Sequence, residues 1–100
     1  MHNEVSHNGR LLGLVGYRAM LEKDFTEIPD LEFKTALMAC QPPHIAVRLE
    51  FNCSPKALFL GLHVNGKRLK FAENVFYEIS EHKISKVWSV IDKSAIEAQL

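Results

Sequence analysis

The sequence predicts an α+β domain: a curved antiparallel sheet of four to five strands packed on one or two helices, with a short helix at the C-terminus. Two patterns predict this class. Apolar residues recur every three or four positions between Leu11 and Asp24, which is typical of an amphipathic helix. Apolar and polar residues alternate from Ile45 to Asn52, which is typical of a strand with one buried and one solvated face.

The composition is that of one ordinary globular domain. The chain has 100 residues, of which 47% are hydrophobic and 24% are charged. Its 12 basic and 12 acidic residues balance, so we expect no nucleic-acid partner. No apolar run reaches the ~20 residues that cross a bilayer, and Met1–Glu4 does not begin a signal peptide. We therefore expect a cytoplasmic protein with no membrane partner.

The N-terminal half is expected to hold the long helix and two strands. The helix is predicted over Leu14–Lys23, and the segment around Pro29 ends it. One strand follows within Leu31–Ala39, and the next covers Ile45–Asn52. Pro42-Pro43 must lie in the connection between these strands, because proline donates no backbone hydrogen bond to a ladder.

The C-terminal half is expected to form a long hairpin. Arg68–Ser80 is the first strand, Glu81–His82 is a two-residue turn, and Lys83 begins the returning strand. This turn predicts a register in which Glu73 opposes Val90. Alternation then places these residues on one mainly apolar face: Leu69, Phe71, Glu73, Val75, Tyr77 and Ile79, with Ile84, Lys86, Trp88, Val90 and Asp92.

Glu73 and Asp92 are the two acids on this predicted face. Two carboxyl groups close together in a dry pocket raise the pKa of one of them, which suits a base and a neutral acid acting together. Each has a structural alternative. Glu73 could point to solvent at a bulge, and Asp92 could cap the final helix. Ser94 and Glu97 have the S-x-x-E spacing of a capping box, which would leave Asp92 free.

The sequence contains no motif for a metal or a cofactor. Its five histidines show no H-x-x-x-H spacing, and it has no G-x-G-x-x-G, P-loop or G-x-S-x-G motif. We therefore expect no cofactor. Cys40 and Cys53 lie at opposite ends of one predicted strand, much farther apart than the ~7 Å limit for a disulfide. Both are expected to be free thiols.

Several short segments, in this order along the chain, resemble the SnoaL-like polyketide and ester cyclases. These are α+β cones of the nuclear-transport-factor-like superfamily. The final strand ends W-x-x-x-D at Asp92, and a short helix with a Gln-Leu ending follows. The other matching segments are His7-Asn8-Gly9, Pro29-Asp30, the strand I-A-V-R-L-E-F from Ile45 to Phe51, and Phe59-Leu60-Gly61.

The resemblance implies a pocket enzyme of the cyclase or isomerase kind. Asp92 would act as acid/base on a carbonyl substrate, and Glu73 or His7 would assist. The side chains expected to contact the substrate are Phe71, Tyr77, Trp88 and Val90. The implied ligand is a small apolar or carbonyl-containing molecule. The alternative is a non-catalytic ligand-binding or protein-interaction module of the same fold.

We expect residues 1–100 to form a single domain that lacks the family's usual N-terminal helices. In the family those helices cover the apolar side of the sheet. The single long helix and the short C-terminal one would leave much of that surface bare, beyond what a monomer usually exposes. The sequence therefore predicts a homo-oligomer, with a dimer as the first expectation.

Overall fold

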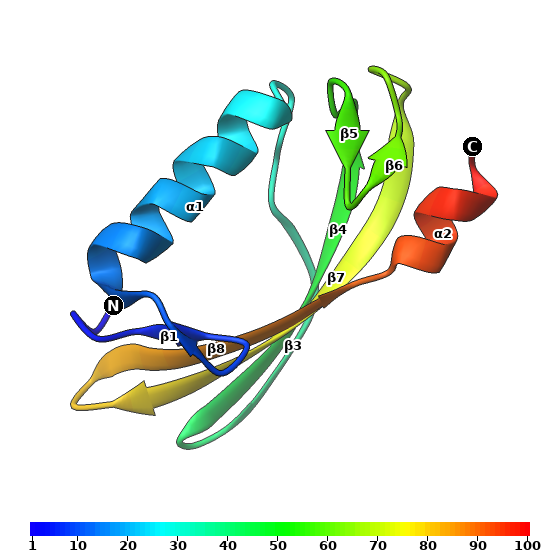
Figure 1. Ribbon diagram of the computed structural model, residues 1–100. Helices are drawn as coiled ribbons and strands as arrows, with labels where there is room; N and C mark the ends of the chain where they lie inside the picture. Colours follow the sequence, from blue (N-terminus) through cyan, green and yellow to red (C-terminus); the bar gives the residue numbers. More distant parts are fainter.

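The computed structural model describes residues 1–100 as a mixed six-stranded sheet with one long helix across its concave side (Figure 1). The helices are α1 (Gly13–Glu27) and α2 (Lys93–Ala98). The strand order is β2-β1-β8-β7-β4-β3, and β5 and β6 form a separate small hairpin. The strands are β1 (Ser6–His7), β2 (Arg10–Leu11), β3 (Lys34–Gln41), β4 (His44–Cys53), β5 (Leu58–Phe59), β6 (Leu62–His63), β7 (Leu69–Ser80) and β8 (Lys83–Ile91).

This architecture confirms the predicted α+β class with its short C-terminal helix, and it corrects several details. The sheet has six strands rather than four or five, and it is not wholly antiparallel, because β1 pairs in parallel with β8. The observed helix is longer than predicted, and the first long strand begins at Lys34, inside the predicted range, and extends to Gln41. Pro42 and Pro43 form the connection between β3 and β4, as predicted.

The core lies on the side of the sheet that faces α1. In β4 the alternation expected from the sequence is observed, with Val47, Leu49 and Phe51 buried and the residues between them exposed. In β7 the same face buries Phe71 and Val75. Because β4 and β7 pair along their whole common length, these side chains form one continuous apolar layer.

The N-terminal segment packs into the fold and supports the start of α1. Val5 is fully buried, and its carbonyl accepts hydrogen bonds from the amides of Leu12 and Gly13, at 3.2 and 2.9 Å. The carbonyl of Asn3 accepts from the amide of Leu14 at 2.9 Å. These carbonyls satisfy the first amides of α1, which has no side-chain N-cap. The φ of +70° at Gly13 suits this sharp entry.

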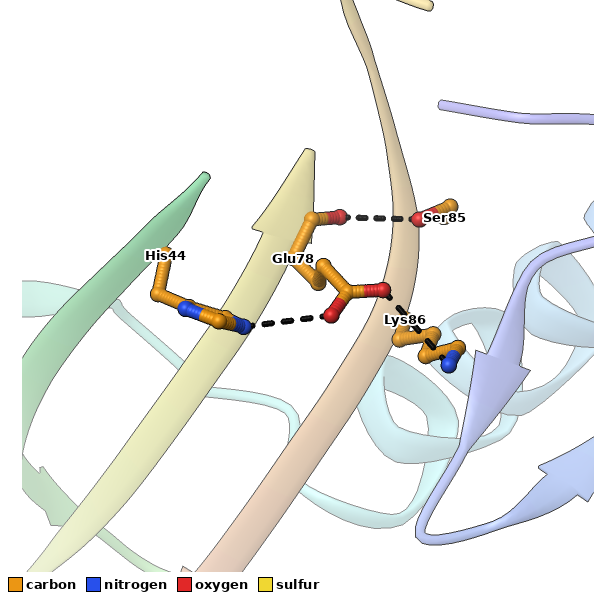
Figure 2. A network of polar contacts seen from close by, with 4 residues as sticks. All are labelled: His44, Glu78, Ser85 and Lys86. Carbon is orange, nitrogen blue, oxygen red and sulfur yellow. Dashed lines mark hydrogen bonds and ion pairs between the residues drawn. The ribbon is translucent and has the colours of Figure 1, made fainter. Parts of the chain in front are cut away.

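The predicted turn of the long hairpin is confirmed, but the predicted register is wrong. Glu81 and His82 form the turn with φ of +54° and +63°, and Ile79 opposes Ile84 as expected. The next pair is Glu78 with Lys86, so Ser85 is an extra residue in β8. Its hydroxyl donates to the Glu78 carbonyl at 3.1 Å, which holds this β-bulge in place (Figure 2).

The bulge reverses the face of every β8 residue that follows it. A one-residue shift in register moves a side chain to the opposite side of the sheet. Val87 is therefore buried on the side of α1. Trp88 and Val90 lie on the outer side, with 37% and 70% of their surface exposed. The prediction that Trp88 and Val90 share a face with Glu73 is therefore wrong.

Asp92 caps α2. Its side chain accepts a hydrogen bond from the amide of Ala95 at 3.1 Å, and the residue is exposed. The alternative with Ser94 as the cap is therefore wrong. The buried Ile96 anchors the helix, and Gln99 bonds through its side chain to both backbone groups of Lys70. Asp92 begins a helix at the end of β8, on the side of the sheet away from α1.

Candidate active site

A cavity of about 540 Å³ lies between α1 and the concave side of the sheet. This volume is within the range of small-molecule sites, roughly 300–1,000 Å³. Most of the residues that line it are apolar, and α1 contributes one stripe of side chains at helical spacing. That stripe consists of Tyr17, Met20, Leu21, Asp24 and Phe25, and Ile28 continues it directly after the helix.

One part of the cavity wall is a series of phenylalanines. Phe51 and Phe71 stack with ring centroids 5.1 Å apart, and Phe59 packs on Phe71 at 5.5 Å. Phe33 meets Phe51 edge-on at 5.5 Å, and Phe25 meets Phe33 at 6.0 Å. All five line the cavity. Such a wall offers a ligand a large apolar surface, and its packed rings lose little conformational entropy when a ligand binds.

The polar side chains of the cavity come from four elements. Strand β1 contributes one, α1 two, β7 two and β8 one. They are His7, Tyr17, Asp24, Glu73, Tyr77 and Ser89.

Glu73 is the carboxyl group that β7 presents to the cavity. Its side chain takes part in no salt bridge and no hydrogen bond to another residue. Burial raises its pKa, and the negative charge of Asp24 raises it further. A carboxylate without a cation in an apolar cavity is a stronger base than an exposed one, and it is a group that binds a proton readily.

Asp24 is the second carboxyl group, and it reaches the cavity from α1. Burial is the largest cause of its raised pKa, and the charge of Glu27 adds to it. Lys23 and His7 act in the opposite direction and lower the pKa of Asp24. The cavity therefore holds two acids, from the helix and the sheet, and both bind protons more tightly than exposed carboxyl groups.

Two tyrosines add hydroxyl groups to the same cavity. Burial raises the pKa of Tyr17 to about 12, with smaller contributions from Tyr77, Glu73 and Asp24. Burial and Glu73 also raise the pKa of Tyr77. Both phenols therefore keep their protons at neutral pH and can donate hydrogen bonds to a ligand oxygen.

His7 is held at the edge of the cavity by β8. Its Nε2 lies 2.8 Å from the Ser89 hydroxyl, and its ring meets Tyr17 edge-on at a centroid distance of 6.1 Å. Burial lowers the pKa of His7, although the charge of Asp24 opposes this. The next residue, Asn8, accepts from the Ser89 amide at 2.8 Å and donates to its carbonyl at 3.2 Å. These bonds fix β1 and therefore the imidazole.

The structure brings together part of the predicted site. Glu73, His7, Phe71 and Tyr77 line the cavity. Asp92 does not, because it caps α2 on the outer side of the sheet. Trp88 and Val90 do not, because the bulge at Ser85 turns them outward. The expectation that Asp92 lies in the cavity beside Trp88 is therefore wrong.

Sequence reasoning missed three polar residues of the cavity, Tyr17, Asp24 and Ser89. A signal for two of them was present. Tyr17 and Asp24 are seven residues apart, with Leu21 between them, so they share one face of a helix that continues one residue beyond the predicted end at Lys23. An acid inside such a stripe is a candidate for a working group. Ser89 carried no signal, because the predicted register placed it on the opposite face.

No group of three or more His, Cys, Asp or Glu side chains in the structure could hold a metal ion. Neither helix has the length and apolar character that a membrane span requires. Both cysteines are free thiols, as predicted, with Cys53 buried and Cys40 exposed. Burial raises the pKa of Cys53 to about 11, so this thiol belongs to the core.

The fold and the cavity define a class of protein: an α+β cone in which a curved sheet and a helix enclose a mainly apolar cavity. The chain belongs to the SnoaL-like polyketide cyclase family, because the sequence model of that family matches residues 1–100. The family resemblance seen in the short segments of the sequence is thus confirmed. The comparison with curated proteins gave no match.

Solved structures show the same relationship. The chain is 50% identical to a SnoaL-like polyketide cyclase from Agrobacterium tumefaciens, with a TM-score of 0.97 over 99% of this chain and 78% of that one. TsrD from Streptomyces laurentii has a TM-score of 0.85 at 19% identity, over 98% and 75% of the two chains. IdmH from Streptomyces antibioticus has a TM-score of 0.80 at 13% identity, over 99% and 80%. The last two share the fold.

Proposed function

We propose that the cavity binds a small carbonyl compound and that Glu73 removes a proton from the carbon next to its carbonyl group. The observation that carries this proposal is the position of Glu73, an unpaired carboxyl group facing an apolar cavity. Its raised pKa brings it closer to the working pH, where a general base is most effective. The enolate formed in this way can close a ring or return the proton elsewhere.

The other polar side chains have roles that follow from their chemistry. Tyr17 and Tyr77 donate hydrogen bonds to the oxygen on which negative charge develops. Asp24, with its raised pKa, supplies or receives a proton on the side of α1. His7, bonded to Ser89, assists from β1. The phenylalanine wall holds the apolar part of the substrate and excludes water from the reacting atoms.

The experiment measures proton exchange directly and requires no natural substrate. The ketone 2-tetralone is a small bicyclic molecule with exchangeable protons on both carbons next to its carbonyl group, and buffer alone gives the uncatalysed exchange rate. Its deuterium uptake in D₂O is followed by proton NMR with the wild-type protein, with Glu73→Gln and with the control Glu22→Gln. Glu22 is 67% exposed on α1 and lies outside the cavity.

The proposal predicts that the wild type and Glu22→Gln accelerate exchange above buffer. Glu73→Gln should lose most of this acceleration, on the order of 10²-fold or more for a general base. Asp92→Asn should exchange as the wild type does, because Asp92 lies outside the cavity. Equal rates for Glu73→Gln and the wild type would contradict the role of Glu73.

A binding module without catalysis remains the second candidate, and one observation favours it. Asp92, the residue that the resemblance marks as acid/base, is exposed at the start of α2 rather than in the cavity. This candidate predicts that 2-tetralone shifts the methyl resonances of Leu49, Val75 and Ile91, which line the cavity, without any acceleration of exchange. Acceleration that depends on Glu73 would exclude it.

A further inference from the structure

Ser89 is a nucleophilic hydroxyl of the cavity to which the proposed proton transfer gives no reacting role. It lies on β8, half-buried, with its oxygen 2.8 Å from His7 Nε2, and both residues line the cavity. An activated serine is recognised by an imidazole nitrogen within about 2.6–3.2 Å of its hydroxyl oxygen, because the imidazole takes the proton as the oxygen attacks. The pair therefore has the geometry of a nucleophile with its base.

The strand pairing places Ser89 in the middle of the polar part of the cavity. Strand β1 is parallel to β8, and His7 lies opposite the residue two positions before Ser89, on the same face of the sheet. On the other side of β8, Ser89 opposes Val75 of β7. Its diagonal neighbours on β7 are therefore Glu73 and Tyr77, at a separation that long side chains can span. A carbonyl group bound at Ser89 thus lies among the polar groups that the sheet contributes.

One short segment holds both members of the pair. Asn8 follows His7 directly, and its side chain accepts from the Ser89 amide at 2.8 Å and donates to the Ser89 carbonyl at 3.2 Å. The Asn8 amide also donates to the Val87 carbonyl at 2.8 Å. These three bonds fix the serine and the imidazole relative to each other before a substrate binds. Such preorganisation removes much of the entropic cost of an attack.

The charges around His7 suit a base. Burial lowers its pKa from the ordinary 6.5, so the imidazole is neutral at pH 7. In the tautomer that carries its proton on Nδ1, Nε2 is free to accept the Ser89 proton. The negative charge of Asp24 acts on this pKa in the opposite direction, and it stabilises the imidazolium once the proton has arrived. Tyr17 and Tyr77 keep their protons and can donate to the oxygen of the attacked carbonyl group.

We propose that the cavity also hydrolyses small uncharged esters, with Ser89 as the nucleophile and His7 as its base. The Ser89 oxygen bonds to the ester carbonyl carbon, and the hydroxyl proton moves to His7 Nε2. The bond from that carbon to the alcohol oxygen then breaks, and His7 gives the proton to the departing alcohol. Water attacks the acyl-serine in the same way, which releases the acid and restores Ser89.

The lining of the cavity selects uncharged esters. Its acidic side chains are Asp24 and Glu73, and no lysine or arginine lines it. A carboxylate would meet two like charges without a cation to pair with, whereas a neutral ester can place its apolar group against the phenylalanine wall. The same charges favour release of the acid that hydrolysis produces. Because this reaction does not use Glu73 as a base, it is tested separately from the proposed proton transfer.

The first experiment traps the nucleophile in the wild-type protein. Diisopropyl fluorophosphate is a small uncharged reagent that phosphorylates an activated serine and loses fluoride. Trypsin then separates Val87–Lys93, whose only hydroxyl residue is Ser89, from Ser94–Leu100, whose only hydroxyl residue is Ser94. We expect the adduct on the first peptide and none on the second, because Ser94 is exposed and lies outside the cavity. No adduct at Ser89, or equal labelling of the two peptides, would overturn the proposal.

The second experiment measures the hydrolysis of 2-naphthyl acetate, an uncharged ester whose product 2-naphthol is fluorescent. The wild type and the control Ser94→Ala should accelerate hydrolysis above buffer. Ser89→Ala and His7→Gln should each lose about 10²-fold or more of this acceleration, and circular dichroism checks that both are folded. Treatment of the wild type with diisopropyl fluorophosphate should have the same effect. Full acceleration by Ser89→Ala, or by the treated protein, would overturn the proposal.

Labelling and proton exchange together separate this activity from the proposed function. An adduct at Ser89 in a protein that does not accelerate the exchange of 2-tetralone would support the ester activity and contradict the role of Glu73. Exchange that depends on Glu73, without an adduct at Ser89, would overturn the ester activity. Ser89 would then be a positioning residue for His7, through the bond of 2.8 Å between them.

Discussion

The two faces of the sheet use the same strands for different purposes. On the concave face, Phe71 of β7 is 7% exposed and Glu73 has no cation beside it. On the outer face, Phe76 of the same strand is 52% exposed, and Glu78 contacts His44 and Lys86. The difference shows that covering by α1 decides the chemistry of a face. On the face that α1 covers, Glu73 stays unpaired and binds a proton more readily, whereas on the open face Glu78 lies between two basic side chains.

The largest expected effect is a difference in stability between alanine variants of two phenylalanines on opposite faces of β7. Phe71→Ala should lower the free energy of unfolding by ~3–5 kcal/mol, because it removes a buried ring that stacks on Phe51 at 5.1 Å. Phe76→Ala should cost below ~1 kcal/mol in the monomer, since half of that ring is already in water. Urea unfolding followed by Trp88 fluorescence at low protein concentration measures both. Equal losses of unfolding free energy in the two variants would contradict the difference in burial between the two faces.

A smaller effect concerns the acid of the concave face. Burial raises the pKa of Glu73 above its ordinary 4.5, so the folded protein keeps a proton where the unfolded chain has lost it. The free energy of unfolding therefore falls as the pH rises from about 4.5 through the raised pKa. Glu73→Gln should remove this loss, so the variant should exceed the wild type in stability at pH 7 and match it more closely at pH 4.

The measurement is the difference in urea-unfolding free energy between Glu73→Gln and the wild type across this pH range. Taking the difference cancels the contribution of His7, whose lowered pKa has the opposite sign and favours the folded state as the pH rises toward 6.5. Glu22→Gln is the control, because Glu22 is exposed. A Glu73→Gln variant that is less stable than the wild type at pH 7 would contradict the unpaired state of Glu73.

Most of the fold could be predicted from the sequence because its signals are local. The alternation in Ile45–Asn52, the two prolines of the first hairpin and the Glu81–His82 turn each define one element, and all were confirmed. The pairing of β1 with β8 could not be predicted. It joins two residues of β1 to a strand about 80 positions away, and nothing in a short polar segment specifies such a partner.

Only part of the site was predicted from the sequence. The bulge at Ser85 explains why most of the β8 residues were placed on the wrong face. In β8 both sets of alternate residues contain apolar side chains: Trp88 and Val90 in one set, Val87 and Ile91 in the other. Alternation therefore cannot say which set faces the cavity, and the register depends on the bulge at Ser85. Strand β7 precedes the bulge, and its residues Phe71, Glu73 and Tyr77 line the cavity on the face that the sequence predicted.

The smallest expected effect on stability concerns the end of β8, where Asp92 caps α2 on the outer side of the sheet. Asp92 caps α2 through the amide of Ala95, at 3.1 Å. Asp92→Ala should therefore cost ~0.5–2 kcal/mol of unfolding free energy. Asp92→Asn should restore most of it, because asparagine caps about as well as aspartate. Ser94→Ala should change stability by less than ~0.5 kcal/mol, since Ser94 is exposed and caps nothing.

Urea unfolding of these three variants ranks the two capping candidates. A larger cost for Ser94→Ala than for Asp92→Ala would reinstate the capping box and free Asp92 for another role. The Asn variant also separates structure from catalysis, because it keeps the cap and removes the charge. If Asp92→Asn is as stable as the wild type and still accelerates proton exchange, Asp92 serves the fold alone. The acid chemistry of this chain then belongs to Glu73 and Asp24, on the face that α1 covers.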